Sequence, residues 1–287
     1  VFVEQFPELQ EKMAFAILFI PSVFFWGSGI LKDPITLSGV GWVTYSFYGI
    51  VMKRGLLISN LITLILSGYI ILSIKPYIIY ALFTGISIWS FSHFQKSIRN
   101  KLLNVLSGPI LIVLIATGGY ILLTALGKDR GKFSIDNILE YAVIVQQDLK
   151  KDYYGGNTFD IGDFDASASS MLSKAPLAIN AALFRPYLWE ARNPVMLLSA
   201  LEGTCLFIFA VYLLVYKLKI TGCLRYLNRT PLLLFAFSFS LFFSFAVGIS
   251  TSNFGSLVRY RIPAIPFFLA SLFIFDYYNK KQLNQEP

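Results

Sequence analysis

Long apolar runs separated by short polar segments are the feature that most constrains how this chain can fold. An α-helix needs roughly 20 mostly apolar residues to cross the hydrocarbon layer of a bilayer. The runs do not alternate between apolar and polar residues, which favours helices over the strands of a membrane barrel. The sequence therefore predicts an all-α, polytopic transmembrane helix bundle of about eight spans, at residues 13–30, 35–52, 56–74, 77–94, 103–126, 195–216, 231–249 and 262–278.

Composition and chain order support a membrane protein in three parts. Hydrophobic residues make up 56% of the chain and charged residues 14%, whereas soluble domains carry about a quarter charged residues. We expect N-terminal transmembrane helices at 1–126, an outer-face, periplasmic segment with amphipathic juxtamembrane helices at 127–194, and C-terminal transmembrane helices at 195–287.

The basic residues predict the orientation, because cytoplasmic loops retain Lys and Arg. Alternate loops are basic, and we place them inside: Lys53 and Arg54; Lys96, Arg99 and Lys101; Lys217, Lys219, Arg225 and Arg229; Lys280 and Lys281. The Lys32-Asp33 turn, the Lys75-Pro76 turn and residues 127–194 and 250–261 then lie outside. Both termini are expected in the cytoplasm. The net charge of +8 is explained by this topology and by anionic lipid, without nucleic acid.

The outer segment 127–194 predicts two helices around a loop. Ser134 can cap a helix with apolar residues at spacings of three and four up to Leu149. Residues 152–165, rich in Gly and Asp, predict a loop. A second helix is expected from Pro176 to Leu183, ended by Pro186. Tyr187 and Trp189 would then form an aromatic belt at the outer interface.

The first candidate site is the Lys32-Asp33-Pro34 turn at the outer end of the first span. Asp33 can cap a helix that starts at Pro34, which makes a structural hairpin. Alternatively, Asp33 is a general base or a ligand for a divalent cation such as Mg²⁺ or Mn²⁺, and Lys32 binds phosphate. Both interpretations stay open.

The second candidate is Arg259-Tyr-Arg261. In an extended segment these two arginines project to the same side, and guanidinium groups bind phosphate oxygens in a bidentate way. Alternatively, they extend to the phosphates of membrane lipids.

The third candidate is Glu202 with the Arg185 to Glu190 segment. Glu202 lies about two turns into its predicted span, where a carboxylate needs a partner or a wet cavity. We expect a basic partner such as Arg185 or Arg259, in a structural ion pair or at a substrate site. A fourth group, Asp160, Asp163 and Asp165, departs from the spacing of a calcium loop and predicts a solvated loop.

Other residues argue against several classes of site. His93 is the single histidine, which disfavours a Ser-His-Asp triad or a His-based zinc site and predicts a structural role for His93. Cys205 in a span and Cys223 in an inside loop predict neither a disulfide nor a metal site. The start at Val1, without a signal-peptide pattern, suggests the C-terminal portion of a longer protein.

Three segments together resemble a known family: Phe19-Ile-Pro-Ser-Val-Phe-Phe-Trp-Gly-Ser-Gly-Ile-Leu-Lys-Asp33, Leu183-Phe-Arg-Pro-Tyr-Leu-Trp-Glu190 and Gly255-Ser-Leu-Val-Arg-Tyr-Arg-Ile-Pro263. Their placement is similar to the C-terminal part of bacterial GT-C glycosyltransferases, which are similar to dolichyl-phosphate-mannose-protein mannosyltransferases and surface-polysaccharide polymerases. The resemblance implies transfer of a sugar from a polyprenyl-phosphate carrier to a glycan, lipid or protein acceptor at the outer face of the membrane. It matches Asp33 to the second acidic residue of the family, and the first has no counterpart here.

The resulting hypothesis assigns Asp33 as the catalytic or metal-binding carboxylate and Arg259 and Arg261 as phosphate binders. Lys32, Arg185, Glu190 and Glu202 complete the predicted substrate site. A departing phosphate develops negative charge, which fixed arginines stabilise, and an acceptor hydroxyl needs a carboxylate to take its proton. A flippase or other transporter of lipid-linked oligosaccharides, and a non-enzymatic membrane assembly protein, are the alternatives.

Overall fold

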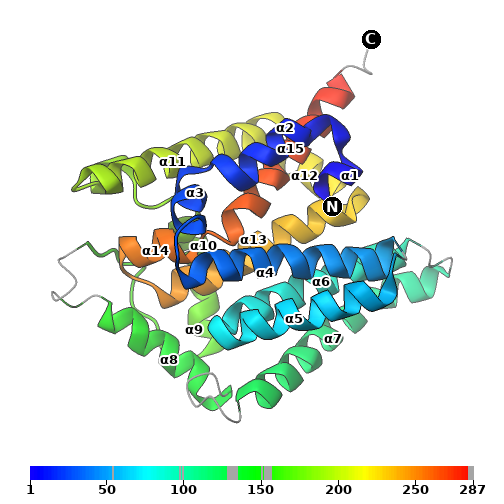
Figure 1. Ribbon diagram of the computed structural model, residues 1–287, viewed down its shortest axis with the longest axis horizontal. Coiled ribbons are helices and arrows are strands. Elements are labelled where there is room, and N and C mark those ends of the chain that lie inside the picture. Colours follow the sequence, from blue (N-terminus) through cyan, green and yellow to red (C-terminus); the bar gives the residue numbers. More distant parts are fainter. Residues whose placement is uncertain are drawn as a thin grey trace. The chain divides into compact units, whose positions relative to one another are not determined.

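The computed structural model describes residues 1–53, 55–96, 98, 100–127, 135–149, 151 and 157–283, and most of these residues lie in helices (Figure 1). The chain forms two compact units. The first unit contains Val1–Ser97, Ile208–Ser240 and Ile262–Pro287, and the second contains Ile98–Phe207 and Leu241–Arg261. The units therefore combine segments that are far apart in the sequence.

The helices divide between the units as follows. The first unit holds α1 (Phe2–Gln5), α2 (Gln10–Ala14), α3 (Pro21–Gly27), α4 (Lys32–Phe47), α5 (Leu57–Ile74), α6 (Tyr77–Gln95), α12 (Lys219–Arg229) and α15 (Ala264–Leu283). The second holds α7 (Lys101–Gly127), α8 (Ile135–Asp148), α9 (Ala168–Ser173), α10 (Ala175–Phe184) and α14 (Phe254–Tyr260). Helices α11 (Pro194–Ala210) and α13 (Pro231–Ser250) contribute residues to both units.

The predicted all-α, polytopic membrane bundle is confirmed, with fewer continuous spans than expected. Within the described residues, 5 helices are long and apolar enough to cross a membrane, and the count rises to 7 if each of two bent helix pairs is one span. The five are Lys32–Met52, Leu57–Ile74, Tyr77–Gln95, Pro194–Lys217 and Pro231–Ser250. The apolar part of α7, Leu106–Ile121, falls among the shorter apolar helices.

The span predicted at 13–30 is wrong as a continuous helix, because it breaks at Pro21. The helical segments Pro7–Phe19 and Pro21–Ser28 meet at 56°. Proline has no N–H to donate, and its ring disfavours helical dihedrals at the preceding residue. Ile20 is accordingly extended, with φ −72° and ψ 126°.

Close aromatic packing joins α6 to α13 inside the first unit. The ring of Trp89 stacks on Phe235, with centroids 4.6 Å apart, and on Tyr48 at 6.1 Å. A Cβ on Gly85 would lie 3.1 Å from Phe239, so a glycine there lets the helices approach. Helices α4 and α5 lie side by side (Figure 1).

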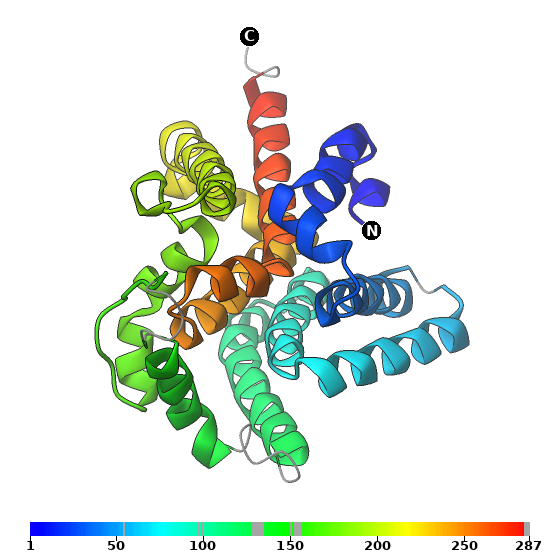
Figure 2. The same cartoon turned by 60° about the vertical axis from the view of Figure 1, so that its left-hand side comes forward.

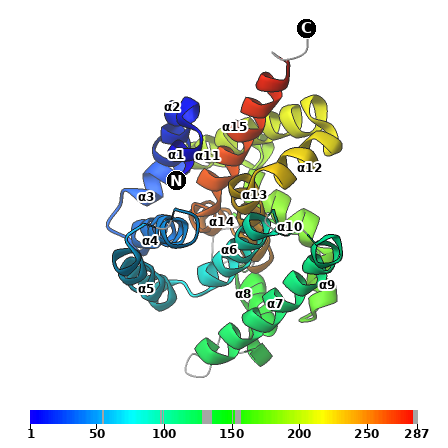
Figure 3. The same cartoon turned by 90° about the vertical axis from the view of Figure 1, so that its right-hand side faces the viewer.

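Most of the basic segment at 217–229, expected as an inside loop, forms helix α12 (Lys219–Arg229), which contacts α15 (Figure 3, yellow and red). The Tyr226 and Tyr278 rings stack at 5.0 Å, and the Tyr226 hydroxyl donates to Gln282 at 2.7 Å. These contacts connect helix α12, which lies between two spans in the sequence, to the C-terminal helix α15.

The second unit confirms both helices expected in 127–194. Helix α8 begins at Ile135 and contacts α7 (Figure 2, green), while the expected cap Ser134 lies outside the described residues. Helix α10 ends at Phe184, two residues before Pro186. Residues 152–156 are likewise outside the described residues, and 157–165 contain no helix.

The loop prediction missed two features of the second unit. Helix α9 follows it, capped by Ser167, whose side chain accepts from the Ser170 N–H. Thr158 also forms an antiparallel bridge with Asn253, in which the Phe159 N–H donates to the Ser252 carbonyl at 2.8 Å.

Helix α10 is approached closely by glycines of α11 and α13. A Cβ on Gly248 would overlap the carbonyl oxygen of Ala178 and lie 2.6 Å from its carbonyl carbon. A Cβ on Gly203 would meet the carbonyl of Phe184 in the same way, 3.0 Å from the carbon. Small residues of this kind allow membrane helices to pack backbone against backbone.

Candidate functional site

Asp33 forms a buried ion pair with Lys75 in the first unit. The Asp33 side chain is 0% exposed, and one of its oxygens lies 2.5 Å from Nζ of Lys75, whose side chain is 11% exposed. Asp33 is not the helix cap that the sequence suggested, because α4 begins at Lys32 and its N-cap is Leu31, without a side-chain bond. Lys32 itself is exposed.

The ion pair follows from the geometry of a helical hairpin. Asp33 lies in the first turn of α4, and Lys75 follows the last residue of α5. Two antiparallel neighbours place these two ends together. A carboxylate is stabilised at the positive end of a helix and an ammonium at the negative end. The sequence contained this information, because the Lys32-Asp33 and Lys75-Pro76 turns were both expected on the outer side, but Lys75 was not chosen as a site residue.

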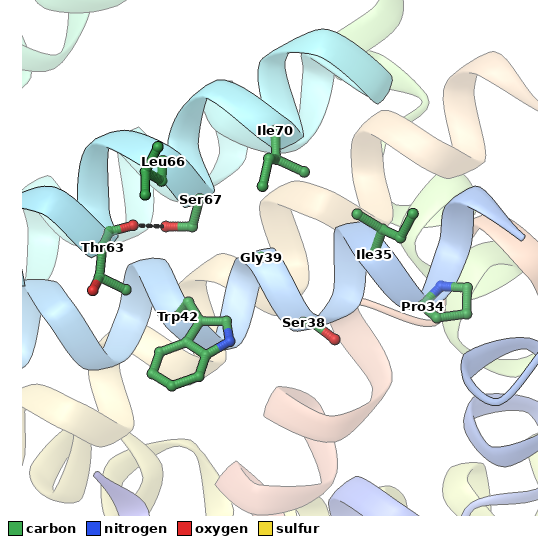
Figure 4. Close-up of a pocket in the computed structure, with 9 residues that line it drawn as sticks. All are labelled: Pro34, Ile35, Ser38, Gly39, Trp42, Thr63, Leu66, Ser67 and Ile70. Carbon is green, nitrogen blue, oxygen red and sulfur yellow. Dashed lines mark hydrogen bonds between the residues drawn. The ribbon is translucent and has the colours of Figure 1, made fainter.

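An apolar groove runs between α4 and α5 from the residue next to Asp33. Its volume is about 520 Å³. Helix α4 contributes Pro34, Ile35, Ser38, Gly39 and Trp42, and α5 contributes Thr63, Leu66, Ser67 and Ile70 (Figure 4). The hydroxyls in the groove are partly occupied within their own helix, since Ser67 donates to the Thr63 carbonyl at 2.6 Å. The groove therefore offers a mainly hydrocarbon surface with a charged pair beside one end.

The donor atoms around Asp33 do not fit the Mg²⁺ or Mn²⁺ considered from the sequence. Divalent cations of this kind take several oxygen ligands, whereas the Asp33 carboxylate is in direct contact with the ammonium of Lys75, which repels a cation. Across the described part of the chain, no group of three or more His, Cys, Asp or Glu side chains could hold a metal ion. That includes the Asp160, Asp163 and Asp165 segment.

Arg261 and Glu202 form the second buried ion pair, in the other unit. Nη2 of Arg261 donates to Oε1 of Glu202 at 3.2 Å, and their side chains are 0% and 5% exposed. The sequence correctly predicted a basic partner for Glu202, but named Arg185 or Arg259 as examples. Arg261 had been assigned to phosphate.

Arg261 also satisfies the C-terminal end of α10. Its Nη1 donates to the carbonyls of Ala182, Leu183 and Arg185 at 3.3, 3.3 and 2.7 Å. The last carbonyls of a helix have no partner within the helix, and a cation there is also favoured by the helix dipole. The structure thus gives this guanidinium four protein acceptors, and its phosphate role stays a prediction.

The two arginines near the last span do not face the same side. Residues 254–260 form helix α14, capped by Asn253, whose side chain accepts from the Ser256 N–H at 3.2 Å. The extended conformation assumed from the sequence is wrong, and positions two apart on a helix do not share a face. Arg259 is partly exposed, so it remains the better candidate of the two for an external anion.

Arg185 pairs with Glu190, and not with Glu202, for which the sequence offered it as a partner. Nε of Arg185 donates to both oxygens of Glu190, at 3.1 and 3.2 Å. The guanidinium carbon lies 5.0 Å from the Phe159 ring centroid, 5.5 Å from Tyr187 and 5.9 Å from Phe254. Arg185 therefore links the segment after α10 to both sides of the Thr158–Asn253 bridge.

The predicted site residues thus fall into two groups. Lys32 and Asp33 belong to the first unit, while Arg185, Glu190, Glu202, Arg259 and Arg261 belong to the second. His93 lies in the last turn of α6, and Cys205 and Cys223 are free thiols.

Two buried ion pairs differ in their surroundings. The Asp33 pair lies beside an apolar groove, whereas Arg261 of the second pair donates to backbone carbonyls. Comparison of the chain with protein-family models, with curated proteins and with solved structures found no match.

Proposed function

We propose that this protein is a membrane glycosyltransferase that moves a sugar from a polyprenyl-phosphate-linked donor to an acceptor at the outer face of a bacterial inner membrane. The observation that carries the proposal is the groove between α4 and α5 with the Asp33–Lys75 pair beside it. A polyprenyl phosphate has the matching chemistry, since a long hydrocarbon chain ends in an anionic group.

The donor would be held in two ways. Its isoprenoid chain lies in the groove, where apolar surface removed from lipid or water gains close packing. Its phosphate is stabilised by Lys32, which is exposed at the first turn of α4, and by the positive end of that helix. A cationic environment for the leaving phosphate lowers the barrier because negative charge develops there.

The proposed step forms one bond and breaks one. The hydroxyl oxygen of the acceptor attacks the anomeric carbon, the bond from that carbon to the phosphate oxygen breaks, and the polyprenyl phosphate leaves with the electron pair. Asp33 accepts the hydroxyl proton. Because Asp33 is buried against Lys75, it must leave or share that contact when the acceptor binds.

Replacing the charged pair with a neutral one separates catalysis from folding. The variant Asp33→Asn with Lys75→Gln keeps a hydrogen bond between the side chains without leaving a buried charge alone. We expect it to remain folded and to lose sugar transfer by about 100-fold or more, since a positioned base contributes at least that much. The measurement uses the full chain in vesicles with a radiolabelled polyprenyl-phosphate sugar, together with its thermal unfolding.

The same assay decides between the classes of function. Wild-type transfer supports the enzyme, movement of the donor across the bilayer without transfer supports a transporter, and neither supports an assembly protein. Full transfer by the neutral pair would remove Asp33 from the mechanism.

Filling the groove tests the site of the lipid chain. Ser38 is exposed in the groove, and we expect Ser38→Phe to weaken donor binding by about tenfold, the effect of losing roughly two methylene contacts. Ile65, on α5 but outside the groove lining and 67% exposed, provides the matched control Ile65→Phe. Equal donor affinity in the two variants, measured with a photoreactive polyprenyl phosphate, would contradict the assignment.

A further inference from the structure

Trp189 presents an open aromatic surface in the second unit. Its side chain is 80% exposed, and its ring stacks on Tyr187 with centroids 4.8 Å apart and planes at 28°. Tyr187 covers only part of the indole, so most of the ring surface remains accessible. An exposed aromatic surface of this kind is suited to binding.

Tyr187, the inner member of the aromatic pair, is held in place by hydrogen bonds. The Tyr187 N–H donates to Oε2 of Glu190 at 2.8 Å, and the Tyr187 hydroxyl accepts from the Asn180 side chain. The Arg185 guanidinium also lies over the Tyr187 ring, 5.5 Å from its centroid. A rigid aromatic surface loses little conformational entropy on binding.

Charged groups flank this surface. Arg185 pairs with Glu190 and donates to the Asp160 carbonyl at 3.2 Å. The Asp160 residue is exposed, and one oxygen of its carboxylate accepts from the Gly162 N–H at 3.0 Å. A carboxylate has about four acceptor positions, so Asp160 can also accept hydrogen bonds from hydroxyl groups.

We propose that Tyr187, Trp189 and the neighbouring Asp160, Arg185 and Glu190 form a binding platform for sugar rings of a glycan acceptor. The C–H groups on one face of a pyranose carry partial positive charge and pack on the negative face of an indole. The ring hydroxyls then reach the carboxylates and the guanidinium. This inference rests on the proposed function in one respect: it takes the bound glycan to be the acceptor of the proposed sugar transfer.

The charged side chains beside the aromatic pair favour binding of a glycan over insertion into the hydrocarbon of a bilayer. Three ionisable residues lie at the platform, and two of them, Arg185 and Glu190, are fixed to each other. Charged side chains are costly in hydrocarbon but are ordinary partners of hydroxyl groups.

The test measures glycan binding directly, without the transfer reaction. The full chain in detergent is titrated with an array of neutral hexasaccharides of glucose, mannose, galactose and N-acetylglucosamine. We expect at least one to bind, with Trp189→Leu weakening its affinity by about tenfold and Trp189→Tyr retaining it. Tyr69→Leu, at an exposed tyrosine of α5 outside the groove lining, is the control and should leave that affinity unchanged.

Three results would overturn the platform: no hexasaccharide binds, Trp189→Leu binds as the wild type does, or brominated lipids in vesicles quench the Trp189 emission, which would place the ring in the bilayer. The two proposals fail separately. Binding that depends on Trp189 without any sugar transfer would keep the platform and remove the enzyme. Sugar transfer together with a saccharide affinity that does not depend on Trp189 would keep the enzyme and remove the platform.

Discussion

Arg261→Ala is expected to destabilise the protein by about 3–5 kcal/mol, the usual cost of removing one partner of a buried ion pair. The substitution leaves Glu202, whose side chain is 5% exposed, without Arg261. It also removes the donor to the carbonyls of Ala182, Leu183 and Arg185. Unfolding of the full chain in mixed micelles, followed as the fraction of SDS is raised, measures the loss.

Removing both charges is the matched control. Arg261→Met with Glu202→Leu should recover much of the stability, because an apolar pair can replace a buried ion pair at little cost. Recovery should be incomplete, since the α10 carbonyls still lack their donor. An Arg261→Ala chain with wild-type stability and no sugar transfer would contradict the structural role and return Arg261 to the phosphate site predicted from the sequence.

Gly248→Ala is expected to cost about 3 kcal/mol, at the upper end of the usual range for adding a carbon to a packed interior. The new Cβ would overlap the backbone carbonyl of Ala178, and backbone of a buried helix cannot rotate away as a side chain can. The prediction is checked by the same unfolding measurement and by the amount of protein in the membrane.

Gly68→Ala on α5 makes the same chemical change without the contact, because a Cβ there meets nothing within 4 Å. It should be neutral or stabilising by up to about 1 kcal/mol, since alanine favours helix over glycine. Equal effects at Gly68 and Gly248 would show that helix propensity, and not the approach of α13 to α10, determines the result.

The sequence predicted those features that depend on local order along the chain. Apolar runs of sufficient length gave most of the membrane helices, and Pro176 and Pro186 marked the ends of α10 closely. Pro21 carried equally clear information, but an apolar run on both sides of it suggested one span where the structure has two helical segments. Asn253 is likewise a good N-cap residue, and it marks the start of α14, where we expected an extended segment.

Partner choice across the fold could not be predicted in the same way. Glu202 needed a cation, yet hydrophobic patterning does not say which of several arginines lies beside it. The Thr158–Asn253 bridge joins two segments that have no periodic pattern. Lys75 is an intermediate case, because hairpin geometry brings it to Asp33 once both turns are placed on one side of the membrane.

The pairing of Glu202 with Arg261 has a consequence for biosynthesis. The two residues are 59 positions apart, so a ribosome adding about 5–20 residues per second makes the arginine roughly 3 to 12 s after the glutamate. During that interval the newly made α11 carries an acidic side chain whose final counter-ion does not yet exist. Until the last helices are inserted, water in the translocation channel or a chaperone must solvate or cover the Glu202 side chain. Nascent chains stalled before residue 261 should therefore be early targets for membrane proteases.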